Sequence, residues 1–417
     1  MEPSRTRKHS RKKPRSETHE VNRNTAIHRL LADDLPLQEI QHRGEQEHPN
    51  ASYDGIIQTC LTFRPKPCKC PVACRFSDQK FLSALSFAHL ELSLHNASMA
   101  KLIPALFAIL LGSSSMAAQV LHFDDLNTRD FAHLDLAKTV VIIPGGILEE
   151  HGPYLPAGTD GIFNRRFADD LAKIIASRPG WTVLMLPLMP LGAGAANEIG
   201  YKYFFAGSCT VLPATLRSVY LDIADQLGAQ HFRWILIVSG HGDPAHNRML
   251  DQAGDYFHDT YGGEMVNVFG YLWAMDADDL RTPREQREDG LAEHATMVET
   301  SWILALDNAA VSKDYKSAKP LPGENLDQLQ KIASSSDWPG YFGAPALAYS
   351  ALGKKQYARW LQQGEELVSS ILAGKAYRNR SRLGDVDDPA DAAALANNER
   401  LERQHQAWLA KKKGLLK

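Results

Sequence analysis

Carboxylate and imidazole side chains that can bind a metal ion lie within one short segment, residues 139–160, TVVIIPGGILEEHGPYLPAGTD. Glu149 and His151 are two residues apart, so in an extended segment they point to the same side, and Asp160 follows nine residues later. Carboxylates and an imidazole form a ligand set suited to zinc, manganese or iron(II) rather than to a metal that prefers thiolates. The alternative is a solvated acidic loop with a surface histidine, because a glutamate and a histidine at this spacing form only a short pattern.

A second segment presents the same kind of chemistry. Residues 233–239, RWILIVS, are an apolar run that ends at Gly240 and is followed by His241 and Asp243. If both apolar runs are parallel strands, their loops meet at the edge where open α/β sheets bind ligands. The two loops would then supply five ligands to a pair of metal ions, with one carboxylate bridging the pair.

The elements that must position these residues follow a regular order. Apolar runs bounded by glycine and proline predict buried strands, and segments with helical spacing predict helices. The expected strands are residues 140–143, 181–188, 233–239 and 265–271, and the expected helices are residues 162–175, 212–227, 246–261, 299–306 and 354–373. The acidic residues 276–293 indicate a loop or lid. This alternation predicts a three-layer α/β/α sandwich with a mainly parallel sheet.

The composition is that of an ordinary globular protein. Of the 417 residues, 44% are hydrophobic and 23% are charged, and the formal net charge is -3. Such a charge argues against a general nucleic-acid binder. The exception is the beginning of the chain, residues 1–98, where a basic run and little apolar periodicity predict a disordered basic arm.

A secretory signal is predicted directly after this arm. Residues 99–118 have a short positive start at Met99, an apolar run and a final stretch of small residues, which are the three parts of a signal peptide in order. A signal peptide does not work behind a long leader, so we expect translation to begin at Met99 and residues 1–98 not to be part of the native protein. The mature chain would start at Ala118 or Gln119 and be periplasmic or secreted. The alternatives are a cytoplasmic protein with a buried core helix here, and a nucleic-acid binder built on the basic arm.

The motifs resemble those of the creatininase family of metal-dependent amidohydrolases. The family's first motif, G-x-x-E-x-H-G-x-x-L-P-x-G-T-D, is similar to residues 146–160 at Gly146, Glu149, His151, Gly152, Leu155, Pro156, Gly158, Thr159 and Asp160. Its later motifs resemble Glu198 with residues 205–208, then residues 239–241 and residues 294–301. The resemblance covers roughly residues 120–375, which implies a creatininase-like domain at residues 119–376, followed by a charged tail at residues 377–417 with a helix over residues 390–412.

The resemblance also implies which residues hold the two divalent ions, whether zinc, manganese or iron(II). Glu149, Asp160 and His241 would hold one ion. The second ion would be held by His151, Asp160 and Asp243, so Asp160 is the bridge. Many relatives carry a glutamate where this chain has Met297, which suggests that Asp243 supplies the missing carboxylate.

Further residues would act around the ions. By resemblance, His294 would donate a proton to the leaving nitrogen, and Glu293 beside it would orient the imidazole or share the proton transfer. The alternative for this pair is an ordinary helix start. We expect Glu299, Glu198 and His246 to contact the ligands rather than the ions. The alternative for Glu299 is a helix residue that only packs, and the alternative for His246 is a histidine on a helix surface.

The implied activity is hydrolysis of a C–N bond other than a peptide bond in a small molecule by a metal-bridging hydroxide. A cyclic amide, a formamide and a small modified peptide remain open as substrates. The family tends towards ring-like oligomers, which implies a homo-oligomer. We expect the protein to bind no nucleic acid and, once the signal peptide has been cleaved, no membrane. The alternative class is a non-catalytic metal-binding or assembly protein that keeps the fold.

Overall fold

The computed structural model describes residues 119–275, 279–386 and 391–412. The predicted basic arm and signal peptide therefore lie outside the described residues. The described part contains a five-stranded sheet in the order β1-β3-β2-β4-β5, in which every neighbouring pair is parallel. The strands are β1 Gln119–His122, β2 Thr139–Pro144, β3 Thr182–Met185, β4 Trp234–Val238 and β5 Glu264–Asn267.

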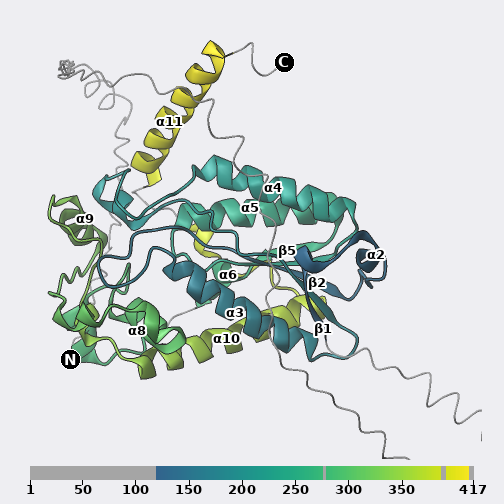
Figure 1. Cartoon of the computed structure of the whole chain (residues 1–417), viewed down its shortest axis with the longest axis horizontal. Coiled ribbons are helices and arrows are strands. Elements are labelled where there is room, and N and C mark those ends of the chain that lie inside the picture. Colours follow the sequence, from purple (N-terminus) through teal and green to yellow (C-terminus); the bar gives the residue numbers. More distant parts are fainter. Residues whose placement is uncertain (1–118, 276–278, 387–390, 413–417) are drawn as a thin grey trace, which may run out of the picture. The chain divides into compact units, whose positions relative to one another are not determined.

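Helices cover both faces of the sheet, so the predicted three-layer sandwich is confirmed. Figure 1 shows α4 (Pro213–Ala229) and α5 (Pro244–Tyr261) on one face, and α3 (Thr159–Ala176) and α10 (Ser350–Leu372) on the other. The remaining helices of the described residues are α2 Thr128–Phe131, α6 Val268–Met275, α7 Pro283–Asp289, α8 Met297–Leu306, α9 Leu326–Ser334 and α11 Asp391–Lys411. Among the described residues, no helix has the length and apolar character needed to cross a membrane.

The central strand β2 shows why the sheet is sandwiched. Its side chains alternate between the two faces, as the pleat of a strand requires. Val140 and Ile142 pack into the core beneath α3 and α10, whereas Val141 and Ile143 pack into the core beneath α4 and α5. All four side chains are 0% exposed. A parallel strand buried on both faces is expected to be continuously apolar.

Two predicted elements differ from the structure. The strand expected over residues 265–271 ends at Asn267, and α6 begins at Val268, because a wholly buried apolar run has no polar face to reveal its helical period. The loop expected over residues 276–293 contains α7, whose start is fixed by a capping box between Thr282 and Glu285.

The beginning of the charged tail is part of the folded domain. The Arg378 guanidinium pairs with Glu264 of β5 at 2.6 Å, and Arg248 of α5 donates to the backbone oxygen of Gly384 at 2.9 Å. Tyr377 is buried. The compact domain therefore continues past the expected boundary at residue 376, and the predicted tail helix follows it as α11.

Candidate metal centre

The site is built on the loops that follow β2 and β4. These strands are hydrogen-bonded neighbours, so their loops leave the sheet side by side. The amide of Asn164, on α3, joins the loops: its Nδ2 donates to the backbone oxygen of Gly145 at 3.0 Å, and its Oδ1 accepts from the backbone N–H of Gly240 at 2.7 Å. The chain is also close-packed here, because a Cβ added at Gly145 would lie 2.9 Å from the Cβ of Ser239.

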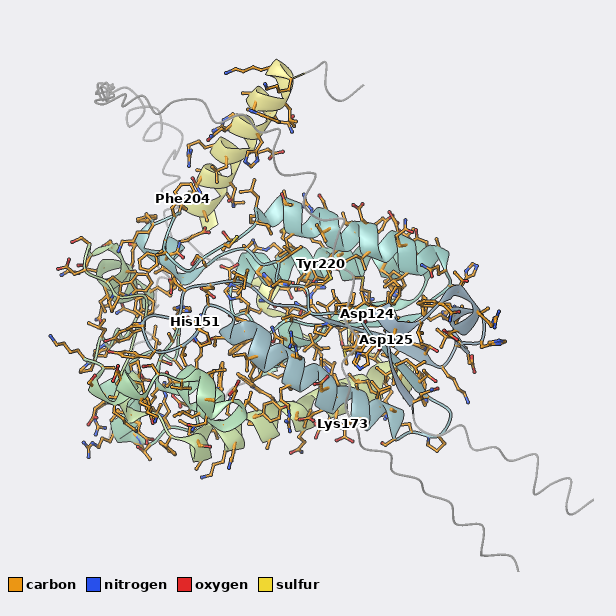
Figure 2. The ribbon with its side chains drawn as sticks, in the orientation of Figure 1. Asp124, Asp125, His151, Lys173, Phe204 and Tyr220 are labelled. Carbon is orange, nitrogen blue, oxygen red and sulfur yellow. The ribbon has the colours of Figure 1, made fainter. Side chains whose placement is uncertain are left out.

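Backbone hydrogen bonds fix the loop that carries Glu149 and His151. The N–H of Glu149 donates to Ala157 at 3.0 Å, and the carbonyl of Leu148 accepts from Cys209 at 2.8 Å. Figure 2 shows His151 inside the ribbon among these loops, whereas Phe204 lies at the surface with 79% of its area exposed. We refer to residues 145–160 as the ligand loop.

The structure brings the three predicted ligands of the first ion together. Atoms of Glu149, Asp160 and His241 that can bind a metal all lie within 4.8 Å of one another. His241 Nδ1 is 3.3 Å from Glu149 Oε2 and 3.8 Å from Asp160 Oδ1. All three side chains are buried.

The imidazole of His241 is oriented by the backbone. Its Nε2 lies 3.2 Å from the carbonyl of Ala193 and 2.9 Å from that of Gly194. Carbonyls only accept hydrogen bonds, so Nε2 carries a proton and Nδ1 faces the carboxylates, where its lone pair would bind a cation. Metal-binding histidines are commonly oriented in this way through their second nitrogen.

His246 is buried behind the same loop and is not a helix-surface residue. Its Nδ1 accepts from the N–H of Ala193 at 3.3 Å, and its Nε2 lies 3.0 Å from Ser239 Oγ. Burial holds the pKa of His246 well below its usual value, so the ring is neutral. His246 therefore supports the carbonyl of Ala193 that orients His241.

Asp160 faces a different histidine with each of its oxygens. Oδ1 is directed at His241, and Oδ2 lies 3.6 Å from Nε2 of His151. The Nδ1 of His151 donates to the backbone oxygen of Glu149 at 3.1 Å, which leaves Nε2 unprotonated on the neutral ring. Oδ2 of Asp160 is buried and has no hydrogen-bond partner among the described residues. A buried carboxylate oxygen without a donor, facing an imidazole lone pair, fits a bound cation.

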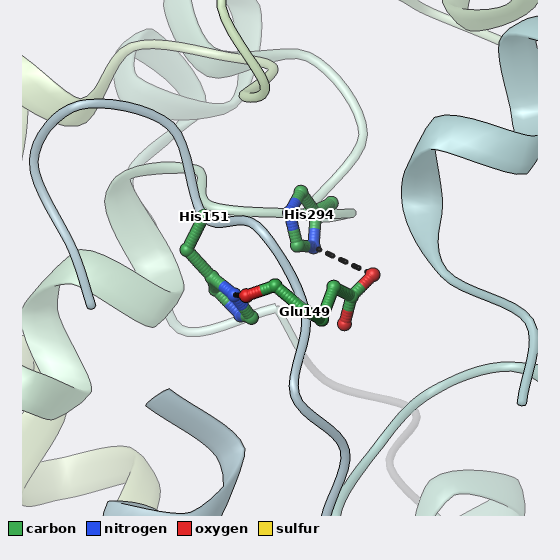
Figure 3. A group of neighbouring side chains, drawn as sticks. All are labelled: Glu149, His151 and His294. Carbon is green, nitrogen blue, oxygen red and sulfur yellow. Dashed lines mark hydrogen bonds and ion pairs between the residues drawn. The ribbon is translucent and has the colours of Figure 1, made fainter. Parts of the chain in front are cut away.

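A second group of potential ligands contains Glu149, His151 and His294. Figure 3 shows the ion pair between His294 and Glu149, whose Nδ1 and Oε1 atoms are 3.5 Å apart. The rings of His151 and His294 have centroids 4.2 Å apart. The predicted proton donor therefore lies directly beside the predicted ligands.

His294 contacts the carboxylate of Glu150, an acid that the motifs did not single out. Nε2 of His294 lies 3.0 Å from Glu150 Oε2, and Glu150 is buried, whereas Glu293 is exposed. Sequence reasoning missed Glu150, since its only signal was its place between the two ligands Glu149 and His151. Its backbone N–H donates to Ser208 Oγ at 3.1 Å, which ties it to the segment after Glu198.

Three predicted residues lie outside both groups of potential ligands. Asp243 caps α5, with Oδ1 accepting from the N–H of His246 at 2.6 Å. Glu198 lies in a 3₁₀ turn at Ala196–Gly200, where burial and the nearby Glu149 raise its pKa to about 7. Glu299 lies in the first turn of α8, and its Oε2 is 3.7 Å from His151 Nε2.

Burial dominates the electrostatics of the cluster. Burial, together with the His294 imidazole, lowers the pKa of His151 to about 3, and burial raises the pKa of Asp160 to about 6. Burial also raises the pKa of Glu299 to about 8. Burial opposes a charge on His241 and His294 as well, but the neighbouring carboxylates outweigh it and raise the pKa of His241 to about 10 and the pKa of His294 well above its usual value. In the absence of a cation these two rings therefore carry the positive charge that a bound metal ion would supply.

Comparison with known proteins gives relatives over the same region. The sequence profile of the creatininase family, described as creatinine amidohydrolase, matches residues 124–368. A mycofactocin precursor peptide peptidase of Mycobacterium ulcerans is 30% identical over 280 residues, covering 62% of this chain and 95% of that protein. Its namesake in Mycobacterium tuberculosis is 24% identical over 283 residues, covering 62% of this chain and 100% of that protein.

Solved creatininases are among the structures that match. The crystal structure of a creatinine amidohydrolase is 18% identical, covers 60% of this chain and 97% of that chain, and has a TM-score of 0.47. Since the family profile spans more than half of the chain, the resemblance is confirmed, and this protein is a hydrolase of the creatininase family.

Proposed function

We propose that the protein hydrolyses an amide bond with the help of two divalent metal ions that share Asp160. The observation that supports this proposal is the division of the Asp160 carboxylate between two histidines, with Oδ1 directed at His241 and the unpartnered Oδ2 directed at His151. The oxygen and imidazole ligands suit zinc, manganese or iron(II).

The residues around Asp160 would have separate roles in binding the two ions and in proton transfer. Glu149 and His241 would hold the first ion, and His151 would hold the second. Such a pair of ions, when bound, activates a water molecule and polarises the carbonyl that it attacks. His294 is close enough to this position to deliver a proton to the leaving nitrogen, and Glu150 holds its ring in place.

Two classes of substrate are in competition. The family description favours the amide bond of a small molecule, as in a cyclic amide or a formamide. The names of the two mycobacterial relatives favour a peptide bond in a short peptide. Because both reactions break an amide C–N bond, the same metal centre and proton donor serve either one.

A substrate panel tests the proposal. The metal-loaded protein is incubated with cyclic amides, formamides and short peptides, and the release of amine is measured, with Asp160→Asn as the control. We expect turnover of one class and no turnover by the control, because the bridging carboxylate is neutralised. Full metal loading without turnover of any class would instead favour a non-catalytic metal-binding protein.

A further inference from the structure

We infer that Glu299, rather than Asp243, supplies the separate carboxylate ligand of the ion on the His151 side of Asp160. The inference rests on the proposed function in one respect only, since it takes the two-ion centre from it. Each ion would then have one imidazole, one carboxylate of its own and one oxygen of Asp160. The first ion would use His241 and Glu149, and the second would use His151 and Glu299.

The first argument is the geometry around His151 Nε2. This nitrogen lies 3.6 Å from Asp160 Oδ2 and 3.7 Å from Glu299 Oε2. Ligand atoms that surround a common cation at about 2.0–2.2 Å are roughly 3–4 Å from one another. Both carboxylates are thus at ligand-to-ligand distance from the same lone pair, which the contact between His151 Nδ1 and its backbone acceptor directs towards them.

The second argument is that Asp160 Oδ2 lacks a hydrogen-bond donor. Asp160 Oδ2 is buried without a hydrogen-bond partner among the described residues, and its side chain is only 7% exposed. The Glu299 side chain is 17% exposed. Two carboxylates brought beside one neutral imidazole in a buried place repel each other unless a cation or a proton lies between them.

The third argument is that the Glu299 carboxylate is held in place. Its Oε2 accepts from the backbone N–H of Ala295 at 2.5 Å. Ala295 has a φ of +53°, a conformation that a residue with a side chain rarely adopts. The turn from His294 to α8 therefore keeps an unfavourable backbone conformation that directs an N–H at this carboxylate, and such conformations persist mainly where the surrounding structure enforces them.

Asp243 has a different task at the start of α5. Its Oδ1 accepts from the N–H of His246 at 2.6 Å, as an N-cap residue does. Its carboxyl group also packs closely against Gly194, where an added Cβ would lie 2.1 Å from the carboxyl carbon. The carboxylate thus stabilises the helix and the backbone turn whose carbonyl orients His241.

Metal stoichiometry separates the two assignments. The full-length protein, Glu299→Gln and Asp243→Asn are stripped, reloaded with Mn²⁺ and measured for ions per chain, and paired ions are detected by their spin coupling in electron paramagnetic resonance. A glutamine can still accept from Ala295 N–H, so a role limited to that hydrogen bond survives the change. An asparagine likewise still caps a helix.

We expect Glu299→Gln to hold one ion and to lose the spin-coupled signal, with the dissociation constant of the second ion raised at least about tenfold. Asp243→Asn should keep two ions and the coupled signal. Two ions in Glu299→Gln with the affinity of the unmodified protein, or loss of one ion from Asp243→Asn, would overturn the inference. An unmodified protein that never holds two ions would instead overturn the proposed two-ion function.

Discussion

His294 is in contact with a carboxylate at each ring nitrogen. Nδ1 faces Glu149 and Nε2 faces Glu150. An imidazole held on both sides has a fixed ring plane, and its proton is available at a defined position. Since Glu149 is also a ligand of the first ion in the proposed centre, the proton donor and the metal are joined by a single side chain.

Replacing His294 by alanine separates chemistry from metal binding. If the residue only delivers a proton, His294→Ala keeps its metal content and loses about 10²- to 10⁴-fold in kcat, which is the usual range for a positioned acid or base. Metal analysis and steady-state kinetics on the same preparation measure both quantities.

The leaving group provides the control for this prediction. An activated anilide needs less help to leave than an alkyl amide, so the defect in His294→Ala should be smaller for the anilide. An equal loss on both substrates, or a loss of metal from the variant, would show that His294 is a metal ligand and not the acid.

The ligand cluster was predictable in part. Glu149, Asp160 and His241 come together because neighbouring parallel strands place the loops at their carboxyl ends at one edge, which the alternation of elements already indicates. The contact between Glu150 and His294 spans 144 residues, and no local pattern reports on such a pair. Asp243 was assigned by its spacing from His241, but the same spacing also places it at the N-cap of α5.

At the scale of elements, α8 is held against α10 by a close approach of their backbones. A Cβ added at Gly353 in α10 would lie 1.9 Å from the backbone oxygen of Ser301 in α8. The start of α8 carries Glu299, so this packing also fixes the position of a proposed ligand. Helices in both regions were predicted from the sequence. The helical spacing of apolar residues does not tell, however, which glycine lies where two helices cross.

Gly353→Ala tests this crossing. In a helix, alanine is ordinarily favoured over glycine by about 1 kcal/mol, but here the added methyl group meets backbone that cannot rotate away. We expect a lower free energy of unfolding, by about 1–3 kcal/mol, in denaturant titrations. Gly158→Ala is the control, because an added Cβ there meets nothing within 4 Å. A Gly353→Ala protein as stable as the parent would mean that the helices can separate without cost.

At the scale of the whole molecule, the stability of the domain should depend on a buried acid far from the ligand loop in sequence. Burial raises the pKa of Asp251 in α5 to about 7, although Arg382 opposes the shift and Asp255 and Asp385 add to it. The folded protein therefore binds a proton that the unfolded chain releases near its ordinary pKa of 3.8. The contribution of this proton to the free energy of unfolding is full below pH 3.8 and is lost as the pH rises through about 7.

Asp251→Asn removes this titration while keeping a side chain of the same shape. We expect the Tm of the variant, relative to the parent, to increase between pH 5 and pH 8, because each unit of pKa shift corresponds to about 1.4 kcal/mol. Thermal unfolding at several pH values is the measurement. A difference in Tm that does not change with pH would show that Asp251 ionises normally in the folded protein.

Export from the cytoplasm is a further prediction about the whole molecule. The prediction rests on the short positive start, the apolar run and the final small residues of residues 99–118. We propose that the native protein begins at Ala118 or Gln119, outside the cytoplasm. N-terminal sequencing and intact mass of protein from cell fractions test this, and peptides from residues 1–98 in the native protein would refute it.

Backbone hydrogen bonds shape the ligand loop. The N–H of Glu149 donates to the carbonyl of Ala157, and the carbonyl of Leu148 accepts from the N–H of Cys209. A loop held by the protein itself does not need a cation to fold around. Chelation should therefore empty the centre without unfolding the chain, and a different ion can then be supplied. The affinity of such ligands for divalent ions rises from Mn²⁺ to Cu²⁺ whatever the protein does, so affinity by itself does not select the working metal. The ion found after purification is therefore expected to reflect which metals the producing cell had in supply.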